Sequence, residues 1–306
     1  MSSISLEREE LSFNDEIGKE YIRLRRVSLK TGTSKSIAIS YAIKYLSETK
    51  IKRPLHIADF GCFDGEFLSQ FKDMSGIDKE SRLYGFDYNE SLLDLGRKNI
   101  PGIEYYKKDL FTDSFNEYKD LFDIGFCVNT LHEIYSFHSK NRVFNHKKGI
   151  NSVMKSIENM TSTIKDGGIL IIFDGVASIH RDKMVTIGIK SEKDLKLFNK
   201  FFNEYQFNKI DYKQVDKFTF SMKYSTFTKF ITKYRFLDNI VWQIESEECY
   251  QYFTPYEFND ALKKVGLQTY EMSLLSPNTG KWSKIVDIIG EKFNFPDEHI
   301  LIIGKK

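Results

Sequence analysis

Short apolar runs alternate with amphipathic stretches through the first half of the chain. Five runs are typical of strands: residues 55–60, 83–87, 103–106, 122–128 and 169–173. Apolar residues at helical spacing occupy stretches between them, most clearly over 149–164. Strands and helices that alternate at this pace predict βαβ units and a mainly parallel sheet. The strands are almost continuously apolar, which indicates that helices cover both faces of the sheet.

The alternation stops after the fifth strand. Residues 175–252 are rich in aromatic residues and lysine, with helical stretches but no βα rhythm. A helix over 255–265 and two closing strands then complete the pattern. We therefore expect an N-terminal helical cap (1–50), an α/β domain made of 51–174 and 253–306, and an inserted helical lid or substrate-recognition region (175–252).

Composition and charge narrow the class of protein without identifying it. Hydrophobic residues make up 41% and charged residues 29% of the chain, as in ordinary soluble globular proteins. The formal net charge is only +2, which gives no general argument for a nucleic-acid partner. The three cysteines form no Cys-x-x-Cys pair, so neither a zinc ribbon nor a disulfide framework is supported. With no signal-peptide pattern and no long apolar window, we expect a soluble, cytoplasmic protein without a membrane partner.

The segment from Asp59 to Gly65 carries the main functional signal. It follows an apolar strand and contains Gly61 and Cys62 ahead of a helical stretch. Glycine allows a tight turn and the close approach of a ligand at this position. Twenty-two positions after Gly65 the second strand ends in Asp87, an acid placed to accept hydrogen bonds from both hydroxyls of a ribose. The loop and this acid together predict an adenosine-type ligand.

The loop favours a ligand that carries positive charge and no phosphate. A dinucleotide requires Gly-x-Gly-x-x-Gly, but Phe63 stands where the middle glycine would be. Asp59 and Asp64 add negative charge that repels phosphates and suits a sulfonium and an amino group. A NAD-dependent enzyme remains an alternative that a nicotinamide titration would test.

This pattern resembles the Rossmann-like (class I) S-adenosylmethionine (SAM)-dependent methyltransferases. Their first motif is acid-x-Gly-x-Gly-x-Gly, which matches here at Asp59, Gly61 and Gly65 and departs at Phe63. The resemblance covers residues 55–173 and 253–306. It implies a seven-stranded, mostly parallel sheet whose last strand is antiparallel.

The resemblance also implies a cofactor site built from successive strand ends. Gly61 would approach the methionine part of SAM, Asp87 would hold the ribose, and Asp109 with Leu110 would lie beside the adenine. Asn129, at the end of the fourth strand, would face the methyl donor. The full predicted set is Asp59, Gly61, Cys62, Gly65, Asp87, Tyr88, Asp109, Leu110 and Asn129.

Candidate catalytic residues follow the fourth and fifth strands. His132 could take a proton from the acceptor, or could serve only local hydrogen bonding. Glu133 and Tyr135 are candidates to contact substrate at the same mouth. Asp174, which ends the fifth strand, could bind a cationic amine substrate.

The sequence thus predicts a SAM-dependent methyltransferase that acts by direct in-line displacement on a small-molecule or peptide acceptor, at O or N. A general base is needed only if the nucleophile arrives protonated. No cluster of metal ligands is evident, so we expect metal independence and, for the assembly, a monomer or homodimer. Two alternatives remain: an RNA methyltransferase that uses the lysine-rich insertion, and a non-catalytic SAM-binding protein.

Overall fold

A computed structural model describes residues 16–27, 35–49, 54–140, 142–276, 278–290 and 293–306. The expected cap (1–50) therefore falls partly outside the described residues. Its described part forms two helices, α2 (Glu16–Val27) and α3 (Ser36–Thr49).

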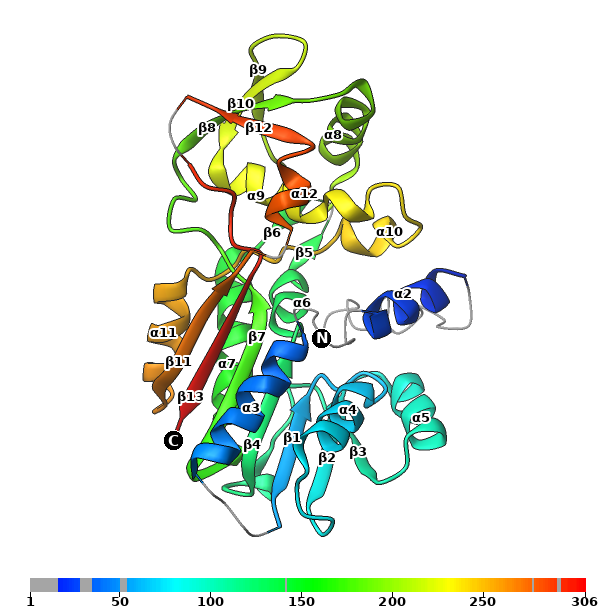
Figure 1. Cartoon of the computed structure of the whole chain (residues 1–306), viewed down its shortest axis with the longest axis vertical. Coiled ribbons are helices and arrows are strands. Elements are labelled where there is room, and N and C mark those ends of the chain that lie inside the picture. Colours follow the sequence, from blue (N-terminus) through cyan, green and yellow to red (C-terminus); the bar gives the residue numbers. More distant parts are fainter. Residues whose placement is uncertain (1–15, 28–34, 50–53, 141, 277, 291–292) are drawn as a thin grey trace.

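A seven-stranded sheet forms the centre of the molecule (Figure 1). Its strands, in spatial order, are β11 (Gln268–Leu275), β13 (His299–Lys305), β7 (Ile164–Gly175), β4 (Phe122–Val128), β1 (His56–Phe60), β2 (Arg82–Asp87) and β3 (Ile103–Lys107). β1 to β4 and β7 pair in parallel, whereas β13 is antiparallel to both β7 and β11. The predicted fold class, with seven strands and an antiparallel last strand, is confirmed.

Helices cover both faces of this sheet, as its apolar strands require. The covering and linking helices are α4 (Glu66–Ser75), α5 (Glu90–Asn99), α6 (Leu131–Ser136), α7 (His146–Thr163) and α11 (Pro255–Lys264). One hydrophobic cluster joins α3 and α4 to the sheet, and a second joins α7 and α11 to it. Since α3 packs on the sheet itself, only α2 is placed as a cap.

The inserted region differs from the helical lid that the sequence predicts. It contains a second sheet, ordered β12 (Val286–Ile289), β8 (Met184–Ile189), β10 (Thr219–Lys223), β9 (Tyr212–Gln214), with all neighbours antiparallel. Its helical elements are α8 (Glu192–Glu204), α9 (Tyr224–Lys233), η2 (Tyr234–Phe236), α10 (Trp242–Glu245) and α12 (Thr279–Trp282). β12 and α12 come from the chain between β11 and β13, so the closing segment returns to complete this unit, which we call the upper module. Figure 1 shows the upper module stacked on one end of the main sheet.

The aromatic residues of the insertion form the core of the upper module. The ring of Phe198 lies 4.3 Å from that of Phe220 and 5.2 Å from that of Phe230, centroid to centroid. All three side chains are buried. These rings therefore serve core packing. Two short elements complete the described chain: η1 (Asn116–Tyr118) and the hairpin of β5 (Ser139–Lys140) and β6 (Val143–Phe144).

Candidate functional site

The loop after β1 has the backbone conformation that its glycines suggest. Gly61 and Gly65 have φ values of +85° and +82°, in the left-handed region. A Cβ on Gly61 would overlap with the Thr130 hydroxyl, and one on Gly65 with the Tyr105 hydroxyl. Phe63 adopts φ +58°, so the loop keeps the left-handed turn at the place where the family pattern has glycine. The departure at Phe63 therefore leaves the shape of the loop intact.

Asp87 ends β2 next to this loop. Its side chain is buried, with Oδ2 accepting a hydrogen bond from the Phe63 backbone N–H (2.9 Å) and Oδ1 one from that of Asn89 (3.0 Å). Burial raises the pKa of Asp87 to about 6, although these two N–H donors oppose the shift. A carboxylate has about four lone-pair sites, so acceptor capacity is left for a ligand.

One cavity, which we call the cofactor cleft, brings together most of the predicted binding residues. Gly61, Asp87, Tyr88, Asp109 and Leu110 all border it. The sequence did not single out three further wall residues that supply apolar surface: Leu92, Phe111 and Phe137. Asp109 accepts a hydrogen bond from the Phe111 backbone N–H at 3.0 Å, which fixes the turn that carries this wall.

A smaller cavity lies on the other side of the Gly61 loop and contains Asp59 and Cys62. Asp59 is 2% exposed, and its Oδ1 has no hydrogen-bond partner among the described residues. Burial and the nearby Asp87 raise the pKa of Asp59 to about 8. Burial also raises the pKa of the Cys62 thiol, so Cys62 is a buried wall residue and no nucleophile. Lys35, 6% exposed, borders the same cavity, and burial lowers its pKa.

Helix α2 borders the cofactor cleft through Tyr21 and Arg25. Arg25 donates hydrogen bonds to the Glu133 carboxylate and to the Tyr21 hydroxyl, and the ring of Tyr21 lies 6.1 Å from that of Phe63. Arg25 borders the cofactor cleft, the smaller cavity and a third, larger cavity. Glu133, a predicted catalytic residue, thus lines the cofactor cleft but is ion-paired to the cap. Arg25 and Tyr21 are not among the site residues predicted from the sequence, because their contacts with Glu133 span more than 100 positions.

His132 and Asp174 form a buried pair whose roles differ from those expected. The His132 Nδ1 lies 2.7 Å from Asp174 Oδ1, and Nε2 lies 3.7 Å from Glu248 Oε2. Burial works to lower the pKa of His132, but the two carboxylates outweigh it and raise that pKa to about 10. A protonated imidazole cannot accept a proton from substrate at neutral pH. Local hydrogen bonding, the other role considered for His132, is what the geometry supports.

Asp174 serves the start of helix α6. It is fully buried, and its Oδ2 accepts from the backbone N–H groups of Leu131 (2.7 Å) and Thr130 (3.1 Å). A carboxylate at a helix N-terminus satisfies donors that have no partner within the helix. The expectation that Asp174 binds substrate is therefore corrected, since its oxygens are already used by the protein.

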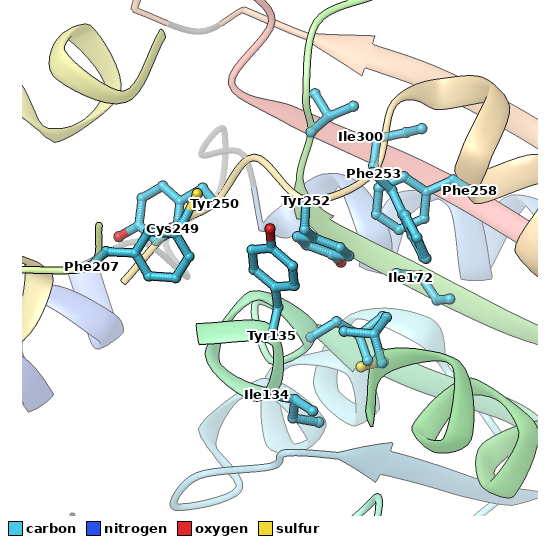
Figure 2. Packing of buried hydrophobic residues seen from close by; sticks show 14 of the residues in the cluster. Ile134, Tyr135, Ile172, Phe207, Cys249, Tyr250, Tyr252, Phe253, Phe258 and Ile300 are labelled. Carbon is cyan, nitrogen blue, oxygen red and sulfur yellow. The ribbon is translucent and has the colours of Figure 1, made fainter. Parts of the chain in front are cut away.

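Tyr135 lies in the packing between α6 and the upper module rather than at a cavity wall. Figure 2 shows its ring pointing toward Tyr252. The ring centroid lies 5.4 Å from that of Tyr252 and 5.8 Å from that of Phe207. Its hydroxyl is 2.9 Å from His146 Nδ1. Tyr135 borders none of the three cavities, so the geometry gives no support to the expectation that it is catalytic.

Asn129 ends β4 in the left-handed region, at φ +54°. It borders the larger cavity, which we call the acceptor cavity, and its Oδ1 has no hydrogen-bond partner among the described residues. Tyr21, Arg25 and Glu248 border both the acceptor cavity and the cofactor cleft. These three residues mark the place where the two cavities meet.

The described residues also bear on wider classes of function. No helix among them is long and apolar enough to cross a membrane. The same residues contain no group of three or more His, Cys, Asp or Glu side chains placed to hold a metal ion. Metal independence stays a prediction.

Comparisons with known proteins give similarity in solved structures only. No protein-family model matches the sequence, and no curated protein matches it significantly. A SAM-dependent methyltransferase from Mesorhizobium loti is 14% identical, with 88% of this chain and 98% of that chain covered and a TM-score of 0.47. Magnesium protoporphyrin IX methyltransferase from Synechocystis, solved with S-adenosylhomocysteine (SAH), is 11% identical, with 94% and 95% covered and a TM-score of 0.47. A Burkholderia thailandensis 1,6-didemethyltoxoflavin-N1-methyltransferase is 10% identical, with 94% and 86% covered and a TM-score of 0.45. At these TM-scores the likeness decides neither activity nor substrate, for which the site itself must supply the argument.

The Gly61 loop gives a first testable prediction. We expect Gly61→Ala to lower the free energy of unfolding by roughly 2–4 kcal/mol, because the new Cβ adds a clash with Thr130 to the cost of a positive φ. Gly76→Ala is the matched control: its φ is +60°, but nothing lies within 4 Å of the added Cβ. It should cost only about 1 kcal/mol. Urea denaturation of both variants makes the comparison, and equal losses would contradict the predicted clash.

The buried histidine gives a second prediction. We expect His132→Gln to lower the free energy of unfolding by roughly 3–5 kcal/mol at pH 6, because Asp174 and Glu248 would lose their buried cation. A folded pKa near 10 lies above the unfolded value, so this stabilisation is full below about pH 6.5 and is lost as pH rises toward 10. The difference from wild type should therefore shrink between pH 7 and pH 10 in urea titrations.

His146→Gln is the control for that series. His146 is exposed, its Nδ1 lies 2.9 Å from the Tyr135 hydroxyl, and its ring lies 6.3 Å from that of Phe144. It should cost about 1 kcal/mol or less. A His132→Gln loss no larger than this, or one that does not vary with pH, would show that His132 carries no buried charge.

Proposed function

We propose that this protein binds SAM and transfers its methyl group to an acceptor held in the acceptor cavity. The observation that carries the proposal is the pair of buried acids on either side of the Gly61 loop. Asp59 has an unsatisfied oxygen, and Asp87 keeps acceptor capacity toward the cofactor cleft. Two such acids around a backbone loop favour a ligand with a ribose and a positive charge.

The residues present fit SAM part by part. Asp87 would accept hydrogen bonds from the ribose hydroxyls, and the turn of Asp109 and Leu110 would flank the adenine. The unsatisfied Oδ1 of Asp59 suits the ammonium group of the methionine part. Lys35, which shares the smaller cavity with Asp59, suits its carboxylate.

A dinucleotide fits this site less well. In that case the N-terminus of α4 would have to hold a pyrophosphate. Here Asp64 Oδ1 accepts a hydrogen bond from the Glu66 backbone N–H at 3.3 Å, and Asp64 Oδ2 pairs with Arg26 at 2.7 Å. The first turn of the helix therefore already holds a carboxylate, which would repel phosphate.

When bound, SAM supplies a methyl group that an acceptor lone pair attacks, while the carbon–sulfur bond breaks and its electrons stay on sulfur. The contribution of the chain is to align the two reactants and to exclude water. Tyr21, Arg25 and Glu248 lie where the two cavities meet, so they are placed to shape the path between donor and acceptor. His132 holds its proton and orients Glu248 rather than acting as a base.

The upper module and α2 are proposed to select the acceptor. Both border the acceptor cavity, α2 through Leu24 and Arg25 and the module through Arg235 and Tyr250. A cavity enclosed by three parts of the chain suits a small molecule or the end of a peptide, methylated at O or N. A long nucleic acid would need an open, cationic surface, and the net charge of the chain is only +2.

Calorimetric titration with SAM and SAH tests this proposal. We expect micromolar binding by the wild-type protein and a loss of at least tenfold in Asp87→Ala, because the ribose loses its buried acceptor. Asp94→Asn is the control, since Asp94 lies on the exposed face of α5 and pairs only with Arg97. It should bind as wild type does. Folded wild-type protein that binds neither compound would overturn the proposed function.

A further inference from the structure

The acceptor cavity has walls of mixed polarity. Most aromatic rings of the insertion pack in the core of the upper module, but Phe236 and Tyr250 border the cavity. The module also presents polar side chains to the cavity: Arg235, Asn239, Asn278 and Lys281. A pocket that exposes these groups is suited to a polar ligand, because each polar group must find a partner once water is displaced.

Arg235 is held in place but keeps donors free for a ligand. Its Nη2 lies 3.4 Å from Glu298 Oε1, and its guanidinium lies over the Phe236 ring, 4.6 Å from the centroid. These contacts orient the group, yet 52% of the side chain stays exposed. Guanidinium has five N–H donors in a planar fork that matches carboxylate and phosphate. Lys281 borders the same cavity, and no carboxylate among the described residues lies within ion-pair distance of it.

The carboxylates that border the cavity are paired with another cation, the buried Lys233. Glu245 and Glu248 are the acids that border the cavity. Lys233, which is 1% exposed, lies 2.6 Å from Glu245 and 4.0 Å from Glu248, oxygen to nitrogen. Glu248 also faces the protonated His132. Glu245 and Glu248 are therefore each paired with a cation other than Arg235 or Lys281, whereas Arg235 pairs with the buried Glu298.

The part of the cavity wall formed by the main sheet offers hydrogen-bonding groups instead. Asn129 Oδ1 and His299 Nδ1 have no hydrogen-bond partner among the described residues, and both residues border the cavity. His299 is 5% exposed and stacks on Phe173 at 4.8 Å. Burial lowers its pKa to about 4, so its ring is neutral and can meet an N–H or O–H group.

We propose that the methyl acceptor carries an anionic group, a carboxylate or a phosphate, which Arg235 and Lys281 bind while its nucleophilic end faces Asn129 and His299. This inference rests on the proposed function, because it names the substrate class of that site.

Matched pairs of probes test the inference on protein saturated with SAH. Calorimetry would compare benzoate with benzamide, glycolate with glycolamide, and phenyl phosphate with phenol. We expect at least one anion to bind tenfold or more tightly than its neutral partner. The first two pairs report a carboxylate preference and the third a phosphate preference. If no anion binds more tightly than its neutral partner, the inference is wrong.

Variants then locate the preference. Arg235→Gln and Lys281→Gln should each remove most of the tenfold advantage and leave the affinity for SAH unchanged. Lys217→Gln is the control, because Lys217 is an exposed cation of the same module and pairs with Glu192 away from the cavity. An anion preference that survives in both variants would overturn the inference. Should Arg235→Gln fail to fold after leaving Glu298 buried, the exposed Lys281 decides the test.

The SAH titration separates this inference from the proposed function. If wild-type protein does not bind SAH, the methyltransferase proposal fails, and the same probe pairs on unliganded protein still report whether the cavity prefers anions.

Discussion

The buried carboxylate of Asp174 connects the parts of this molecule. It lies near the end of strand β7 and accepts hydrogen bonds from the first N–H groups of α6 and from the ring of His132. Because α6 is thereby fixed, Thr130 can close on Gly61, Glu133 can reach Arg25 of the cap, and His132 can reach Glu248 of the upper module. The positions of Thr130 and Glu133 in the wall of the cofactor cleft therefore depend on this one anchor.

The parts that the sequence predicts correctly depend on local signals. Apolar runs predict the strands. A residue at the end of a parallel strand, such as Gly61 after β1 or Asp87 in β2, lies at the carboxyl edge of the sheet regardless of the rest of the chain. The seven-stranded sheet and the shared cavity of Gly61, Asp87, Tyr88, Asp109 and Leu110 follow from such signals. Phe63 shows the limit of such local signals, because the turn, and not the residue type, sets its left-handed backbone conformation.

The parts that sequence reasoning missed depend on contacts between distant segments. β12 pairs with β8 about a hundred residues earlier in the chain. Because residues 175–252 lack this partner strand, their sequence alone predicts a helical lid and not a sheet. Arg25 of α2 and Lys35, just before α3, border the site although neither belongs to a recognised motif. Asp174 and Tyr135 occupy positions in the sequence where substrate contacts are expected. In the fold both are buried, so Asp174 caps a helix N-terminus and Tyr135 packs in the core.

The electrostatics of the cofactor site explain why a cation suits it. Asp59 and Asp87 are both buried, burial raises the pKa of each, and the nearby Asp87 raises that of Asp59 further. A folded pKa above the unfolded one means that the empty site gives up stability as pH rises through the window between the two values. A ligand that brings a sulfonium and an ammonium stabilises the ionised acids, so its binding releases protons and recovers that stability. A phosphate-bearing ligand would add to the same repulsion. The two acids at the strand ends therefore make the site favour cationic ligands. The glycine loop alone does not specify this preference.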